Sequence, residues 1–194
     1  MPEIKKILSK QEETKKRTRN QLIVGTILIG LMLFSTIGYA LNSDKTGSTI
    51  KKTTYNGIDF LRDGEYWQFS YNGQDFVTRY SPEEVKYIKV PINLKLNDYS
   101  GKPLYFVSDT QLDLEIARNL NTNVLRVQNA CIEEKKCKEG LPLKDCSLDN
   151  IIIFEETQNE TGSIYQNQKC VFITANYLNQ TQYSDAFLFK ILGI

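Results

Sequence analysis

The sequence predicts an α+β protein in which an N-terminal transmembrane helix precedes a mixed-sheet domain. Residues 22–41 are uncharged, short alternating apolar segments joined by turn signals follow them, and later segments repeat apolar residues at helical spacing. We therefore divide the 194 residues into a basic tail (1–21), a span (22–41), a polar stalk (42–54) and an α+β domain (55–194).

The uncharged segment LIVGTILIGLMLFSTIGYAL has about the length that a helix needs to cross a bilayer. Seven basic and three acidic residues precede it, whereas 17 basic and 20 acidic residues follow it. Because basic residues beside a span favour the cytoplasmic side, we expect a single-pass protein of the cell membrane with its N-terminus in the cytoplasm and its C-terminal domain outside. The tail is expected to touch anionic headgroups of the lipid bilayer.

Three other interpretations of this segment remain open. Gly38-Tyr39-Ala40 resembles a signal-peptide cleavage site, and cleavage would also export the rest of the chain. A buried core helix would be unusually long. A pilin-like filament subunit would carry an early glutamate in its apolar helix, but no glutamate occurs between Asn20 and Leu41.

The exported domain is expected to open with a three-strand meander over residues 58–80. Asp63-Gly64 and Asn72-Gly73 are strong hairpin signals, because their turn type requires positive φ. In the stretch between them, Trp67, Phe69 and Tyr71 alternate with polar or less apolar neighbours. With Tyr66, Phe76 and Tyr80 they form either an aromatic ligand face or, as we favour, core and cross-strand pairs.

Helix signals and strand signals alternate after the meander. Ser81-Pro82 followed by two glutamates starts a short helix, which Val90-Pro91 ends. A β-α-β crossover follows, with a strand over 103–109, a helix capped by Ser108 and Gln111, and a strand over 124–127. A β-hairpin pairs 150–155 with 163–175, and a C-terminal helix runs over 181–192, with Asp185 in its first turn and Lys190 in its last.

Cys131, Cys137, Cys146 and Cys170 are the only cysteines of the chain, and the chain has no histidine. This composition excludes zinc sites and catalytic dyads that use histidine. Five, eight and twenty-three residues separate successive cysteines, so neither a paired C-x₂-C knuckle nor a C-x-x-C redox motif is present. Two disulfides in an exported domain are the simplest interpretation; a Cys₄ zinc site and free thiols are the alternatives.

The expected hairpin selects one of the three possible pairings. It places Cys170 opposite the residues that precede strand 150–155, where Cys146 lies. We therefore predict Cys146–Cys170 and, by elimination, Cys131–Cys137, which closes a solvated loop of mixed charge. A redox-labile Cys131–Cys137 bond is the functional alternative to a structural one.

The candidate site residues are few. Asp109 follows a predicted parallel strand and would form a carboxylate cluster with Asp113 and Asp185 for metal binding or acid–base work. The simpler interpretation is that Asp109 caps a helix and that the other two are solvated. No phosphate loop, nucleophile elbow or nucleophile with a base is visible, so we predict no catalytic residue, cofactor or metal ligand, and the slightly acidic domain disfavours nucleic acid.

Two N-x-[ST] triplets begin at Asn159 and Asn179, both in predicted loops. They are candidate glycosylation sites if the host glycosylates exported proteins.

Four segments and the basic tail together carry a resemblance to a group of proteins: FSTIGYAL (34–41), FSYNGQDFVTRYSPEEV (69–85), the KDC…QKCVFI pair and DAFLFKILGI (185–194). The chain resembles small, uncharacterised single-span membrane-anchored proteins of archaea, including the ultra-small DPANN lineages. The resemblance implies topology and compartment, and it favours pairing Cys146 with Cys170. It implies no activity and no functional residue.

The sequence therefore predicts an anchored extracytoplasmic domain that binds or scaffolds another membrane or envelope protein. A carboxylate-dependent envelope enzyme and a pilin-like subunit are the alternatives.

Overall fold

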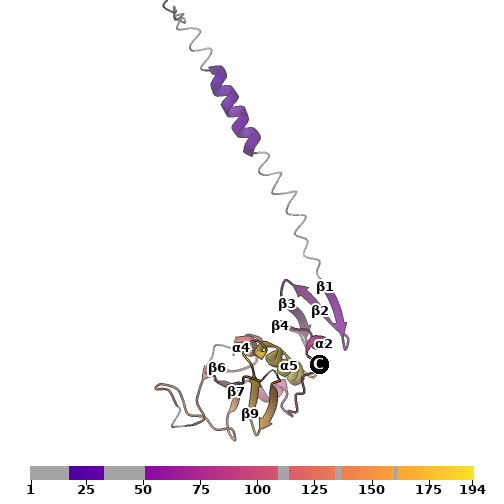
Figure 1. Ribbon diagram of the computed structural model, residues 1–194, viewed down its shortest axis with the longest axis vertical. Helices are drawn as coiled ribbons and strands as arrows, with labels where there is room; N and C mark the ends of the chain where they lie inside the picture. Colours follow the sequence, from indigo (N-terminus) through magenta and orange to yellow (C-terminus); the bar gives the residue numbers. More distant parts are fainter. Residues whose placement is uncertain (1–17, 33–50, 109–113, 134–136, 160) are drawn as a thin grey trace, which may run out of the picture. The chain divides into compact units, whose positions relative to one another are not determined.

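The computed structural model describes residues 18–32, 51–108, 114–133, 137–159 and 161–194 (Figure 1). The chain forms two compact units, Met1–Thr49 and Ile50–Ile194. In the first unit residues 18–32 are helical, which includes positions 22–32 of the expected span, while positions 33–41 lie outside the described residues. Among the helices in the described ranges, none combines the length and the apolar character that crossing a membrane requires.

The second unit begins with a four-stranded antiparallel meander, one strand more than predicted. Its strands are β1 (Lys51–Tyr55), β2 (Ile58–Asp63), β3 (Tyr66–Tyr71) and β4 (Gln74–Thr78). The turn before β4 has φ of +51° at Asn72 and +79° at Gly73, as the Asn-Gly signal predicts. β1 lies partly in the expected stalk. It was not predicted, because a polar edge strand with a single large apolar residue, Tyr55, shows little alternation of apolar and polar residues.

The aromatic residues of the meander form its core. Trp67, Phe69 and Phe76 are each at most 4 % exposed, whereas the side chains of Tyr66, Gln68 and Ser70 on the other face of β3 are exposed. The rings of Phe69 and Phe76 stack across the strand pair with centroids 5.4 Å apart. The interpretation as core is therefore confirmed for these buried rings, and Tyr71 and Tyr80 pack against the same core.

The second sheet is mixed and has the strand order β6-β5-β7-β9-β8. β5 pairs in parallel with both β6 and β7, and β7 pairs in parallel with β9. The helix α4 (Leu114–Leu120) connects β5 to β6, so the predicted β-α-β segment is confirmed. The strands are β5 (Pro103–Val107), β6 (Arg126–Asn129), β7 (Asn150–Glu156), β8 (Ser163–Asn167) and β9 (Cys170–Ala175).

The predicted hairpin between 150–155 and 163–175 is wrong in its pairing. The second segment is two strands, because Gln168 adopts a left-handed conformation (φ +54°) and reverses the chain between β8 and β9. The hairpin is therefore β8–β9, and β9 returns parallel to β7. The turn contains no glycine, so the thirteen residues read as one long strand.

The short helix α2 (Pro82–Val85) begins as its sequence predicts. Ser81 is the N-cap, and its backbone N–H donates to the Glu84 carboxylate at 2.7 Å. It ends at Val85, earlier than Val90-Pro91 indicated. A further one-turn helix, α3 (Leu96–Tyr99), precedes β5 and was not predicted.

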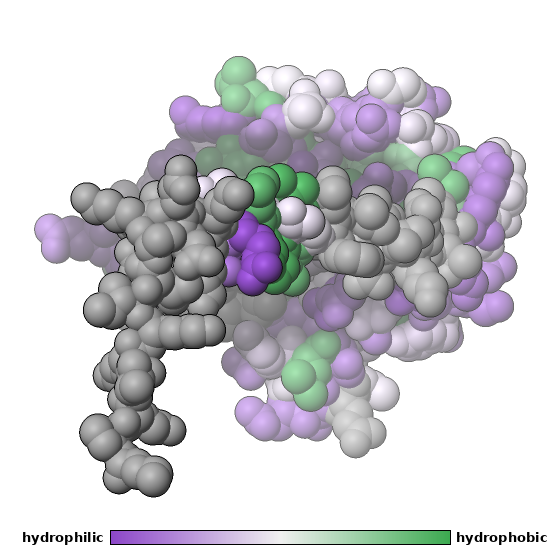
Figure 2. Space-filling view, turned by 90° about the horizontal axis from the view of Figure 1, so that it is seen from above, coloured by the Kyte–Doolittle hydropathy of each residue, from purple (hydrophilic) through white to green (hydrophobic). Residues whose placement is uncertain are grey.

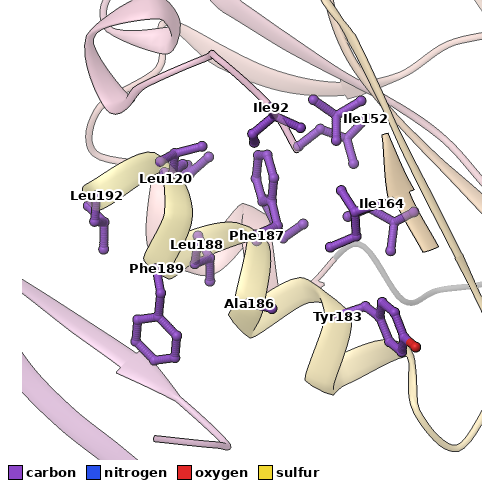
Figure 3. Close-up of a cluster of buried hydrophobic side chains, with 14 of the residues drawn as sticks. Ile92, Leu120, Ile152, Ile164, Tyr183, Ala186, Phe187, Leu188, Phe189 and Leu192 are labelled. Carbon is purple, nitrogen blue, oxygen red and sulfur yellow. The ribbon is translucent and has the colours of Figure 1, made fainter. Parts of the chain in front are cut away.

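The C-terminal helix α5 (Gln180–Leu192) is buried on almost every side. Phe189 points toward the meander, with its ring 5.9 Å from that of Phe69, while Phe187 points toward Ile92 and Ile152 (Figure 3). A helix that buries large apolar residues on several sides belongs to a core, and here Gln180, Ser184 and Asp185 are buried with them. α5 is thus the element around which both sheets pack.

The mixed sheet is covered on both faces. Leu104, Phe106 and Ile152 belong to the core that contains α5. Tyr105, Ile151 and Ile153 form a second apolar cluster with Ala130, Cys170 and, at its margin, Ile132 and Cys146. The segment between β6 and β7 therefore covers the face opposite α5.

The outer edge of β4 is closed by side chains instead of a fifth strand. The Asn119 side chain of α4 accepts the backbone N–H of Val77 and donates to its carbonyl, both at 2.8 Å. One carboxylate oxygen of Asp185 accepts the backbone N–H groups of Arg79 and Tyr80 at 3.0 and 2.9 Å. Two helices thus supply hydrogen-bond partners for Val77 on this edge and for Arg79 and Tyr80 just after the strand.

We expect Asn119→Ala to lower the free energy of unfolding by about 2 kcal/mol, because it leaves the partly buried Val77 N–H without an acceptor. The Val77 carbonyl keeps a bond from Arg118 at 3.0 Å, so only one group is orphaned. Urea unfolding measures the change. Asn121→Ala, at an exposed position of the same region, is the control and should change stability by less than about 0.5 kcal/mol. Equal effects at both positions would contradict the role of Asn119.

Candidate functional site

Both predicted disulfides are present in the structure. Cys146–Cys170 joins residues with Cα atoms 5.0 Å apart, and Cys131–Cys137 joins residues 5.4 Å apart. Cys170 pairs with Ile151 at the start of the parallel β7–β9 ladder, and the Lys169 N–H donates to the Cys146 carbonyl at 2.9 Å. The Cys146–Cys170 pairing was thus predicted correctly, although the expected antiparallel direction of the strands was wrong. The two cysteines still meet because β7 and β9 both begin at this end of the sheet.

The disulfide-tied segment is held against the sheet by polar contacts around Tyr105. The Tyr105 hydroxyl accepts a hydrogen bond from Arg126 at 2.9 Å, and the Lys144 ammonium lies 4.4 Å from the ring centroid. The bond from Arg126 and the nearby Lys144 lower the pKa of the Tyr105 hydroxyl. Tyr105 is only 2 % exposed. Arg126 belongs to β6 of the same sheet, so of these two contacts it is that of Lys144 which joins the disulfide-tied segment to the sheet.

Asp185 is part of the core, which corrects the expectation of a solvated residue in the first turn of a helix. It is 0 % exposed and lies in the second turn of α5, since the helix starts at Gln180. Its second carboxylate oxygen is buried without a partner among the described residues. Burial, and then the charge of Glu115, raise the pKa of Asp185 well above its ordinary value, while the N–H groups of Tyr80 and Arg79 and the charge of Arg118 oppose the rise.

Glu115 and Arg118 form an ion pair beside Asp185. Their nearest charged atoms are 2.6 Å apart at i,i+3 spacing on α4. Burial raises the pKa of Glu115, and Arg118 counteracts this rise. Neither this ion pair nor Asn119 was predicted from the sequence. Asn119 lies three positions after Ile116 and next to Leu120, so a polar residue beside two apolar residues at helical spacing was the signal for its buried position.

The expected carboxylate cluster is not assembled within the described residues, because Asp109 and Asp113 lie outside them. In the described ranges, no group of three Cys, Asp or Glu side chains is placed to hold a metal ion. A cavity of about 90 Å³ lies at the carboxyl ends of β5 and β6, lined by Val107, Ser108, Ala130 and Lys138. This volume is below the roughly 300 Å³ of small-molecule sites.

The candidate glycosylation residues differ in accessibility. Asn159 is exposed in the connection between β7 and β8, whereas Asn179 is half-buried at the N-cap of α5.

Two adjoining clefts run along the C-terminal half of α5 and together form what we call the α5 groove. The first, of about 250 Å³, lies between α5 and α2 and is lined by Val85, Lys86, Ile88, Phe189 and Lys190, among others. The second, of about 580 Å³, is lined by Ile92, Leu94, Lys95, Lys190 and neighbouring residues. Lys190 and Ile194 line both clefts.

The α5 groove combines an apolar floor with a cationic rim. Val85 and Phe189 are buried in its floor, while Lys86, Lys95 and Lys190 are exposed. None of the described side chains that line the two clefts is acidic. Figure 2 shows one face of the molecule, on which hydrophobic residues occur as separate groups among hydrophilic ones.

Comparison of the chain with protein-family models, with curated proteins and with solved structures gives no match.

We expect loss of Cys146–Cys170 to destabilise the domain more than loss of Cys131–Cys137. The bonds close sequence separations of 24 and 6 residues, for which loop-closure entropy gives about 3.4 and about 2.2 kcal/mol. Denaturant unfolding of the two paired Cys→Ser variants measures the difference. Reductant should lower the melting temperature of the parent protein but not that of a variant without cysteines. If reductant leaves the melting temperature of the parent protein unchanged, a structural role of the disulfides is refuted.

We expect Asp185→Asn to become more stable relative to the parent protein as the pH rises from 4 to 8. A carboxyl group whose pKa is raised by folding favours the folded state below its unfolded pKa, and this contribution is lost as pH rises through the folded pKa. The asparagine does not ionise, and its side-chain oxygen still accepts the Arg79 and Tyr80 N–H groups.

Thermal melts across this pH range measure the Asp185 effect. Exposed Asp63→Asn is the control and should show a flat difference from the parent protein. A variant Asp185→Asn that becomes less stable relative to the parent protein as the pH rises would contradict the burial of a proton at this site.

Proposed function

We propose that this chain is a single-pass membrane-anchored extracytoplasmic domain that binds or scaffolds another component of the cell envelope. The observation that carries the proposal is the pair of disulfides within residues 131–170. Structural disulfides persist in oxidising compartments and are rare in the cytosol, so they suggest that this domain is extracytoplasmic.

The N-terminal segment supports an anchor. Helix 18–32 exposes its apolar side chains, with Leu22, Leu31 and Met32 at least 62 % exposed. The uncharged sequence continues to Leu41, and a basic tail precedes it. Apolar residues around a whole helix are typical of burial in lipid or in a core. The resemblance to single-span archaeal proteins supports the same topology, with the N-terminus in the cytoplasm.

Binding is favoured over catalysis by the surroundings of the candidate groups. The Asp185 carboxylate is fully buried and is engaged by two backbone N–H groups, which suits a structural role. The α5 groove, in contrast, is open and offers both apolar contact and charge. We therefore expect another membrane or envelope protein as a partner, with the lipid bilayer holding the anchor, and no nucleic acid.

We expect the protein in native membranes to resist extraction by alkaline carbonate and to retain its first 21 residues. Twenty uncharged residues are long enough to hold the chain in the bilayer. Immunoblotting of the pellet and N-terminal peptide mass spectrometry provide the measurement. A replacement of Ile27 and Leu28 by lysine should release the protein, whereas replacement by alanine should not.

Recovery of a carbonate-soluble protein that starts at Leu41 would show cleavage of a signal peptide and would overturn the anchor. Protease added to intact cells should digest the C-terminal domain; digestion only after lysis would overturn the outward orientation.

A further inference from the structure

The α5 groove has the two chemical features of a site for an anionic amphiphile. Its floor contains Val85, Ala186 and Phe189, all buried. Its rim carries Lys86, Lys95 and Lys190, whose flexible stems can lie along apolar surface while the ammonium groups reach outward. Apolar contact and cationic charge together are what bind proteins to anionic membrane surfaces.

The charge of the groove is unbalanced. None of the ion pairs found among the described residues involves Lys86, Lys95 or Lys190. Glu83 is exposed on α2 nearby, but it lines neither cleft. Because acidic residues outnumber basic ones after the span, three lysine side chains in a lining without acidic side chains are a local concentration of positive charge, even with Asp98 next to Lys95, whose backbone N–H it accepts at 2.8 Å. It is complementary to an anion.

The walls of the groove argue against an extended peptide as the occupant. One wall is α5, and the other is the segment 85–95, which is irregular after the end of α2. A peptide that adds to a sheet needs the free backbone edge of a strand. Among the described residues that line the two clefts, Tyr55 at the end of β1 is the one strand residue, so no strand edge runs along the groove.

The covalent connection favours the membrane itself. Nine residues, 42–50, lie between the expected end of the span and the start of β1 at Lys51. Fully extended, such a connection reaches at most about 35 Å. If the anchor of the proposed function is correct, lipid headgroups are therefore always present near the domain at high local concentration.

We propose that the α5 groove docks the domain on the outer surface of its own membrane by binding phosphate-bearing anionic lipid headgroups. Lys86, Lys95 and Lys190 contact the phosphates, and the apolar floor receives the adjoining part of the lipid. The docking fixes which surfaces of the domain face a partner protein. This inference rests on the proposed anchor and adds the site and the ligand class.

The test uses the full chain reconstituted into nanodiscs of phosphatidylcholine alone or of phosphatidylcholine mixed with phosphatidylglycerol. A water-soluble acetylating reagent labels lysines, and peptide mass spectrometry gives the rate at each position. Lys86, Lys95 and Lys190 should react about fivefold more slowly in the anionic discs. Lys138 and Lys169, which do not line the groove, serve as internal controls and should not change.

A matched pair of variants links the protection to the groove. Lys86→Gln with Lys190→Gln should abolish the protection of Lys95, whereas Lys138→Gln with Lys169→Gln should preserve it. High salt should also weaken the protection, because it screens exposed charges.

The outcomes separate the two proposals. Protein that leaves the nanodiscs on purification refutes the anchor and the docking that rests on it. If the protein stays in the discs, the anchor is supported. Equal labelling rates in both lipids, or equal changes at groove and control lysines, would then refute the docking alone. Equal protection by inorganic phosphate in phosphatidylcholine discs would assign the groove to free phosphate instead of lipid.

Discussion

The structure depends on how the open edge of β4 is closed. A strand edge carries backbone N–H and carbonyl groups that need partners when they are buried. Here Asn119 from α4 bonds both backbone groups of Val77, and Asp185 from α5 accepts the N–H groups of Arg79 and Tyr80 just after the strand. Because both helices also pack in the core with the mixed sheet, these few bonds set how the meander sits on the rest of the domain.

Local signals in the sequence predicted most elements, and the errors arose where partners are distant. Asn72-Gly73, Ser81-Pro82 and the apolar run in 103–109 act within a few residues, and the turn, the helix and the strand that they predict are present. The helix ends at Val85 and the strand at Val107, both earlier than expected. The β8–β9 turn at Gln168 and the polar strand β1 carry weak local signals and were missed or merged. The burial of Asp185 depends on residues more than 100 positions away, which no local pattern reveals.

The cysteines show how a correct result can follow from partly incorrect geometry. Cys146 and Cys170 were expected to meet because a hairpin would place Cys170 across from the residues before strand 150–155. They meet because β7 and β9 are parallel and begin side by side. The α5 groove had no counterpart in the sequence analysis, because its lysines come from the C-cap of α2, from the segment before α3 and from the end of α5. Each of them alone reads as a solvated surface residue.

The compartment in which the domain lies determines which partners it can bind. The disulfides support an exterior domain, and an exterior domain on a short connection to an anchor lies beside the lipids that its lysine-rimmed groove would bind. The most direct test is to alkylate thiols in intact cells, isolate the native protein and map its cysteines by non-reducing peptide mass spectrometry. We expect Cys131 linked to Cys137 and Cys146 linked to Cys170, with no alkylated cysteine. Four alkylated thiols would place the domain in a reducing compartment and contradict this account.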